Sequence, residues 1–330
     1  MLENDKIMKI LFAIGLALLL CAGCRDASAQ GVDPKLLNEF LWWFPSDTET
    51  LLVAQGPFEI TEPLGEEDFP LDAKLREWLT AGLAQQQLVG RKILLAVEGS
   101  RHFREPSGFG VMPHEGCNII LFEESLGGLF ESLEEDAVRV KNIQGHDVII
   151  FEGKSEQDIW TIFLVQLRPN LLLYATDESY LKELLSRVDH GASKRALPPD
   201  LPEWEYVNTG QQFWAIRHYD KAWAKFDPSS PLAKEKTPID NKAIGLVFSF
   251  DPRRSKMAKV KHLSENENAD KIVTAWWTPS SETGPFRKVR PSICLLKPGV
   301  VQVEVNVTDL ETATDFFFVL FWFLGHGVYL

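Results

Sequence analysis

Short apolar segments separated by turn residues dominate the hydrophobic pattern of this chain. Segments rich in β-branched and aromatic residues predict strands, and they lie at 50–54, 92–97, 118–122, 147–151, 213–217, 244–250 and 272–277. Longer apolar segments with helical spacing lie at 71–88 and 126–133. Because the strands are joined by short turns with only occasional helices, the pattern predicts an α+β fold of antiparallel sheets with helices packed on one face.

One order of elements occurs twice along the chain. In each half, a strand, a turn that contains proline, a second strand and a helix follow one another, and proline before asparagine or glycine suits a tight turn. These segments are 162–167, 168–170, 171–175 and 176–188 in the first half, and 293–296, 297–299, 300–307 and 308–324 in the second. The recurrence predicts two tandem related halves. The last helix is expected to be buried or to serve self-association.

The boundary between the halves is predicted near residue 195. The segment Arg195–Glu203 carries three prolines, which remove backbone donors and favour an extended linker. We therefore expect a signal segment over 1–29, a first half over 30–195 and a second half over 196–330.

Charge separates the two halves. The 330 residues include 34 basic and 47 acidic side chains, a net charge of −13, of which −15 falls on 30–190 and +2 on 191–330. So acidic a chain is a poor ligand for phosphate backbones, which excludes nucleic acid as a general partner. The basic segment 221–261 is expected to be solvated surface, and the alternatives are an anion-binding patch or contact with the acidic segment 59–72 of the first half.

The first residues have the pattern of an export signal. Lys6 and Lys9 precede an apolar run over 10–20, which is too short to span a bilayer. The start of translation is open between Met1 and Met8, because acidic residues before the apolar run are unusual in such a signal.

Two processing sites compete after the apolar run. Ala22-Gly23-Cys24 is similar to a bacterial lipoprotein box, in which Cys24 is acylated and becomes the mature N-terminus, although Cys21 stands where the box has Leu, Val or Ile. Ala27-Ser28-Ala29 fits the site of ordinary signal peptidase instead. The lipoprotein interpretation is preferred. It predicts export to the periplasm or outer membrane, with membrane contact only through the N-terminal lipid.

The segment 100–117 is the most site-like part of the chain. It carries His102, His114, Glu115 and Cys117 among glycines and prolines, and a long loop of this kind is often functional. The alternative is a solvated hairpin loop. Structural zinc sites space their ligands in close pairs, and only one such pair is present here, so no metal or cofactor is predicted.

Two tryptophan pairs, at 42–43 and 276–277, are the second feature with possible chemistry. If a pair lies on a strand, its members face opposite sides, so that Trp43, Trp276 or Trp277 would be exposed to stack on a sugar or a partner. Packing in the core is the alternative. Outside the signal only Cys117 and Cys294 remain, either paired in an oxidising periplasm or buried as free thiols.

A resemblance adds to this picture. With its signal, Phe-Pro-Ser-Asp-Thr at 44–48 and Leu-Leu-Leu-Tyr-Ala-Thr-Asp at 171–177, the chain resembles a family of uncharacterised exported bacterial proteins with domains of unknown function. The resemblance implies the fold and the export route, and it carries over no catalytic residues. The sequence thus predicts a non-catalytic binding or scaffold component of the cell envelope, with an envelope protein or a saccharide as partner. The alternative is a hydrolase-like periplasmic enzyme that uses the loop at 100–117.

Overall fold

The chain forms two compact units. In the computed structural model, one unit comprises Met1–Thr48 and Leu52–Ala196, and the other comprises Glu49–Leu51 and Leu197–Leu330. The residues described are 33–59, 90–102, 114–127, 139–154, 159–211, 213–218, 245–251, 256–262, 292–297 and 300–306.

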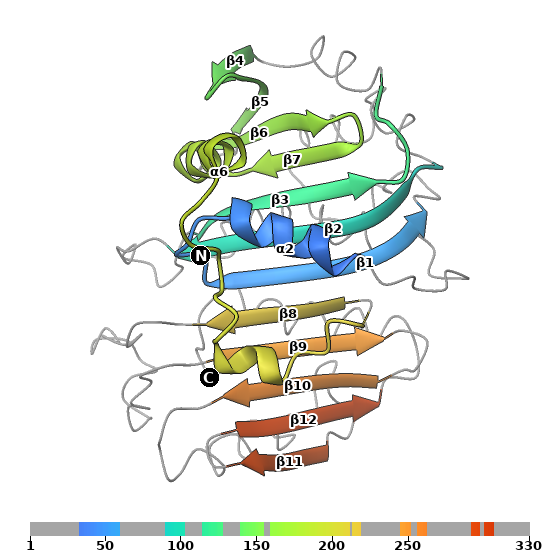
Figure 1. Cartoon of the computed structure of the whole chain (residues 1–330). Coiled ribbons are helices and arrows are strands. Elements are labelled where there is room, and N and C mark those ends of the chain that lie inside the picture. The colour runs from blue at the N-terminus through green and yellow to red at the C-terminus, as the bar shows by residue number, and fades with distance from the viewer. Residues whose placement is uncertain are drawn as a thin grey trace. The chain divides into compact units, whose positions relative to one another are not determined.

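The first unit is built on an antiparallel sheet (Figure 1). Its strands are β1 (Thr50–Glu59), β2 (Lys92–His102), β3 (His114–Phe122), β4 (Arg139–Ile143), β5 (His146–Lys154), β6 (Ile159–Arg168) and β7 (Leu171–Ala175). Their order across the sheet is β1-β2-β3-β7-β6-β5-β4. Strands β2 and β3 pair so that Val97 lies opposite Ile119, and strands β3 and β7 pair so that Ile119 lies opposite Leu173. All three side chains are fully buried.

Two helices, α2 (Pro34–Trp43) and α6 (Glu178–His190), lie on one face of this sheet (Figure 1). The predicted helix start at Asp177 is confirmed, because the Asp177 carboxylate accepts a hydrogen bond from the Tyr180 backbone N–H at 2.8 Å. Tyr180, Leu181, Leu184 and Leu185 recur at helical spacing and are fully buried. The sequence therefore encodes both the start of α6 and the face that it buries.

Replacing Asp177 with alanine should lower the free energy of unfolding by about 1 kcal/mol, because the first turn of α6 loses its cap. Urea denaturation followed by circular dichroism measures the change. Asp177→Asn keeps a capping oxygen and should stay close to the wild type. An equal loss in both variants would show that capping is not the cause.

The helix α2 was not expected from the hydrophobic pattern. Its start is nonetheless encoded, because the Asp33 side chain accepts from the Lys35 backbone N–H at 2.9 Å and Pro34 occupies the first turn. After the helix, the ring of Phe44 lies on β2 against Gly99. A Cβ atom at position 99 would stand 2.4 Å from the Phe44 ring, so glycine is required for this close approach.

The second unit also has an antiparallel sheet. Its strands are β8 (Phe213–His218), β9 (Gly245–Asp251), β10 (Lys256–His262), β11 (Ser292–Lys297) and β12 (Val300–Asn306), in the order β11-β12-β10-β9-β8. Part of the basic segment 221–261 forms β10, which pairs on both sides, with β9 and with β12. The extended conformation predicted for 195–203 is wrong at its last two residues, which begin η1 (Pro202–Glu205), a short 3-10 helix that contains the fully buried Glu203. Proline suits the first turn of such a helix, where its missing donor is not needed.

Most predicted strands within the described residues are confirmed, and the fold is an α+β arrangement of antiparallel sheet and a few helices. The predicted elements at 71–88, 128–133, 272–277 and 309–324 lie outside the described residues. Residues 126 and 127, at the start of one predicted helix, are not helical. In the part of the chain that is described, no helix has the length and apolar character needed to cross a membrane.

Candidate functional site

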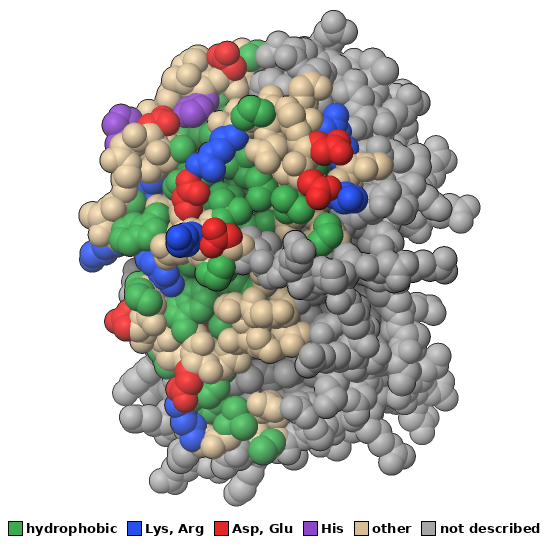
Figure 2. Space-filling model, turned by 45° about the vertical axis from the view of Figure 1, so that its right-hand side comes forward, with side chains coloured by type: hydrophobic (Ala, Val, Ile, Leu, Met, Phe, Trp, Pro, Cys, Tyr) green, Lys and Arg blue, Asp and Glu red, His purple; other side chains and the backbone are tan. Residues whose placement is uncertain are grey.

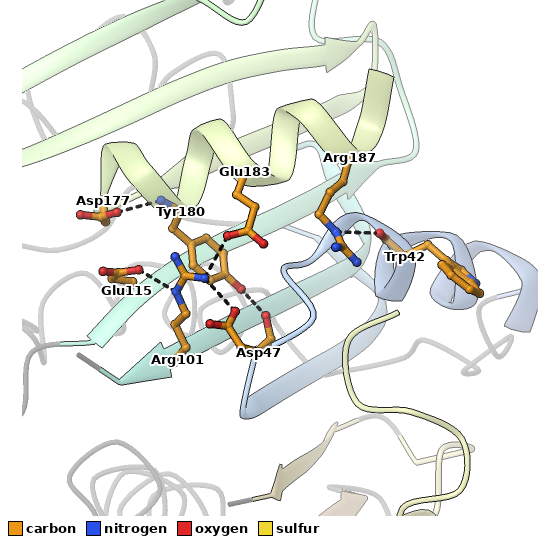
Figure 3. A network of polar contacts seen from close by, with 9 residues as sticks. Trp42, Asp47, Arg101, Glu115, Asp177, Tyr180, Glu183 and Arg187 are labelled. Atoms are coloured by element: carbon orange, nitrogen blue, oxygen red, sulfur yellow. Dashed lines mark hydrogen bonds and ion pairs between the residues drawn. The ribbon is translucent and has the colours of Figure 1, made fainter. Parts of the chain in front are cut away.

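Arg101, near the end of β2, is the centre of a polar network in the described part of the first unit (Figure 3). Its guanidinium binds three carboxylates from three other segments. Nε donates to Glu115 on β3 at 2.7 Å, and Nη1 donates to Asp47 at 2.7 Å and to Glu183 on α6 at 3.0 Å. One cation therefore ties the chain after α2, two strands and the helix α6 together.

Tyr180 completes the network from the first turn of α6. The Arg101 guanidinium carbon lies 5.1 Å from the centre of the Tyr180 ring, a cation–π distance. The Tyr180 hydroxyl and the Thr48 hydroxyl are 2.8 Å apart and share a hydrogen bond. Burial raises the pKa of Tyr180 well above its usual value, so this phenol stays protonated.

The chemistry of Arg101 is that of an anchor. Its side chain is 17% exposed. Burial alone would lower the pKa of Arg101, but the hydrogen bonds to Asp47, Glu115 and Glu183 raise the pKa further than burial lowers it. The side chain is therefore always charged, which suits fixed ion pairing and excludes proton transfer.

The prediction of a loop over 100–117 is wrong at both ends. Residues 100–102 continue β2 and residues 114–117 begin β3, with His102 opposite His114 in the register. Residues 103–113 lie outside the described residues.

Two of the candidate residues in this segment are engaged in the fold. Glu115 is bound to Arg101 and its side chain is only 12% exposed. Cys117 is fully buried, and burial, followed by the nearby charge of Glu98, raises the pKa of its thiol well above the usual value. A buried protonated thiol is a poor nucleophile and a poor metal ligand. The structure places the backbones of His102 and His114 together and describes nothing of their side chains.

The remaining predicted positions fall differently. Trp42 and Trp43 lie on α2 and not on a strand, and helical spacing buries Trp43 at 7% exposure while Trp42 is 38% exposed. Trp43 packs on Phe40, with ring centres 4.9 Å apart, as expected of a core residue. Cys294 is exposed rather than buried, and both Cys117 and Cys294 are free thiols. Cys24, Trp276 and Trp277 lie outside the described residues.

A row of polar residues on the face of the sheet away from Arg101 was not predicted from the sequence. Glu98 lies opposite Asn118, which lies opposite Tyr174, so the three side chains share one face across β2, β3 and β7. Glu98 is half-buried, and burial raises its pKa to about 8. At neutral pH it is mostly a neutral acid able to donate a hydrogen bond. The available signal was a carboxylate in an otherwise apolar strand.

The second unit has its own buried polar pair. His218 Nδ1 on β8 lies 2.8 Å from Oε1 of the fully buried Glu203 in η1. Trp204 packs edge to face on Trp214, with ring centres 6.1 Å apart. The carboxylate orients His218 and ties η1 to the sheet. Among the described residues, no three His, Cys, Asp or Glu side chains group as metal ligands would.

Comparison with models of known protein families gives no match, and comparison with curated proteins gives none. Among solved structures, crystal form I of the protein TP0453 is similar, with a TM-score of 0.42 and 12% identity over 88% of this chain and 99% of that chain. Crystal form III of TP0453 gives a TM-score of 0.41 and 11% identity over 86% and 98%. Likeness at this level says nothing about the activity of this chain.

Proposed function

We propose that this chain is an exported, lipid-anchored and non-catalytic binding component of the bacterial cell envelope. The observation that carries the proposal is the use made of the candidate site. Glu115 is committed to Arg101, and the Cys117 thiol is buried and protonated. The groups that would have performed chemistry instead stabilise the fold, and this favours binding over the hydrolase-like alternative.

The cellular location in this proposal is inferred from the sequence. Residues 1–29 have the charged start, apolar run and small-residue end of an export signal, and Cys24 stands at the end of a lipoprotein-type box. The proposal includes the resemblance to exported bacterial proteins, whose quoted segments have structural roles here. Thr48 bonds to Tyr180 and Asp177 caps α6.

The tandem relation of the two halves belongs to the same proposal. It is supported by strand order, since β1-β2-β3-β7-β6 in the first unit and β8-β9-β10-β12-β11 in the second have the same order when β4 and β5, which follow β3 in the chain, are left aside. The hairpins β6–β7 and β11–β12 also share a register irregularity one residue before the turn, between Gln166 and Arg168 and between Leu295 and Lys297.

The residue before the proline turn makes equivalent contacts in both hairpins. Arg168 binds Glu39 of α2 and lies 5.1 Å from the centre of the Trp43 ring. Lys297 binds Glu205 of η1 at 2.9 Å and lies 4.8 Å from the centre of the Tyr206 ring. In each case a basic residue contacts an acid of a helix and an aromatic residue at the end of that helix or directly after it. This similarity is more specific than strand order alone, and it supports duplication of one ancestral half.

The processing of the N-terminus tests the proposed export and lipid attachment. The wild-type chain should be found in the membrane fraction with a diacylglyceryl group on an N-terminal Cys24, and Cys24→Ser should lose both the lipid and the membrane association. Mass spectrometry of the N-terminal peptide and fractionation of cells measure this, with Cys21→Ser as the matched control that keeps the anchor. A free Gln30 terminus would contradict the anchor, and an unprocessed chain in the cytosol would contradict export itself.

A further inference from the structure

The outer side of α2 presents an exposed indole between polar residues. Lys35, Asn38 and Trp42 follow one another at helical spacing and are all exposed. Trp42 is 38% exposed, and Figure 3 shows it at the end of α2 beside Arg187. Tryptophan combines a flat apolar ring with a polar N–H and is enriched at binding surfaces, so this outward-facing indole is a candidate contact.

Cationic residues from α6 and the segment after it lie along the same helix. Arg187 Nε donates to the Trp42 backbone carbonyl at 3.2 Å, and Arg187 Nη2 donates to the carbonyl of Lys194. Arg195 Nη1 donates to the Asn38 amide oxygen at 2.9 Å. These contacts hold the segment after α6 along α2. We call the six residues Lys35, Asn38, Trp42, Arg187, Lys194 and Arg195 the α2 patch.

The charge of the α2 patch is opposite to that of the half that carries it. The patch has four cations, whereas residues 30–190 have a net charge of −15. Arg187 donates to neutral carbonyls, so these bonds do not neutralise its charge. The nearby carboxylate of Glu183 is bound to Arg101. Acids near the patch include Asp33, which caps α2 beside Lys35, and Asp47, which is bound to Arg101 as Glu183 is. Salt screens charges farther away than about 8–10 Å, so the remaining acids of this half act weakly on a ligand at the patch.

We propose that the α2 patch binds an acidic saccharide of the cell envelope, with a sugar ring stacked on the Trp42 indole and its carboxylate or phosphate groups held by the lysines and arginines of the patch. This inference rests on the proposed function, which places the protein where such saccharides occur. The ring supplies a flat apolar face for the C–H side of a sugar, and Asn38 supplies an amide for its hydroxyls.

A saccharide fits this patch better than a protein or a bilayer. A stable protein interface buries about 800 Å² on each partner around an apolar centre. In the described part of this unit, the other large exposed apolar side chain is Val140, on the edge strand β4. A single indole with the cations of the patch is too small an apolar surface for such an interface or for insertion into lipid.

The test is titration of the full mature chain with hexagalacturonate, followed by calorimetry, with maltohexaose as the uncharged probe of equal length. We expect binding of the acidic probe only, weakening as salt is raised. Trp42→Ala should weaken binding about tenfold or more, and Lys194→Gln about threefold. Both positions are exposed, so the fold should persist, which circular dichroism checks.

Matched controls are Val140→Ala for the loss of an exposed apolar side chain and Lys92→Gln for the loss of an exposed lysine. Both should bind as the wild type does. Equal binding of maltohexaose, unchanged affinity in Trp42→Ala, or binding only to vesicles of phosphatidylcholine and phosphatidylglycerol would each overturn the assignment to an acidic saccharide.

Failure of this inference is distinguishable from failure of the proposed function. Absence of hexagalacturonate binding by a chain that is exported and lipidated at Cys24 would overturn the saccharide site and leave the envelope location intact. A chain retained in the cytosol would overturn the proposed function whatever it binds in the calorimeter.

Discussion

Arg101→Met should lower the free energy of unfolding by about 3 kcal/mol at neutral pH, one of the two largest effects expected in this chain. The change removes the cation that three carboxylates share and leaves Glu115, which is 12% exposed, without its charge partner. Breaking a mostly buried ion pair costs much more than breaking a surface pair, because the remaining charge stays desolvated. Denaturation by urea, monitored by fluorescence, measures the loss.

Two further variants separate charge from geometry. Arg101→Lys keeps the charge but not the planar fork that reaches several carboxylates at once, so its loss should be intermediate. Lys141→Met breaks an exposed pair with Glu178 and should cost no more than about 1 kcal/mol. If Arg101→Met cost no more than Lys141→Met, the central role of Arg101 would be refuted.

The stability of the wild type should fall as the pH rises from about 5 to about 8, and Glu98→Gln should remove this fall. The folded state holds the Glu98 proton up to a pKa of about 8, whereas the unfolded chain releases it near the ordinary value of 4.5. Between these values unfolding releases a proton, so rising pH favours the unfolded state, by up to about 1.4 kcal/mol for each pH unit. Partial exposure of the side chain keeps the slope below that ceiling.

Thermal unfolding at about pH 5, 7 and 9 measures the Glu98 effect. Glutamine has the same size and no charge, so Glu98→Gln should gain most over the wild type above the folded pKa. Glu123→Gln is the matched control, because Glu123 is exposed and paired with Lys92. Parallel pH profiles for the wild type and Glu98→Gln would rule out a buried neutral acid at this position.

Local signals predicted those elements that are formed by neighbouring residues. The hairpin β6–β7 follows from two apolar runs around Pro169 and Asn170, and α6 follows from Asp177 and its apolar spacing. The helix α2 was not predicted because Trp42 and Trp43 suit strands as well as helices, although Asp33 and Pro34 are typical of a helix start.

Elements stabilised by pairing alone were not predicted. Strand β4 has four exposed residues out of five, and β10 is rich in lysine, so neither has an apolar run. Their pairing with β5, β9 and β12 overrides weak local preference.

The Arg101 network could not be read from the sequence because its members are far apart in the chain. Arg101 and Glu183 are 82 positions apart, and Arg101 and Asp47 are 54 apart. No spacing rule connects them. They meet only because α6 and the chain after α2 pack against the sheet near the end of β2. The sequence identified Glu115 and Cys117 as residues capable of chemistry. In the structure Glu115 is bound to Arg101 and Cys117 is buried in the core, so both have structural roles.

The contact between Gly99 and Phe44 restricts the paths by which this protein can evolve. The aromatic ring fills the space where any larger residue at position 99 would begin, so the two positions are not free to vary independently. A lineage that enlarges position 99 must first shrink position 44, whereas the reverse order passes through an overpacked intermediate. At the contact between the chain after α2 and strand β2, the order in which substitutions occur therefore matters, and not only which substitutions occur.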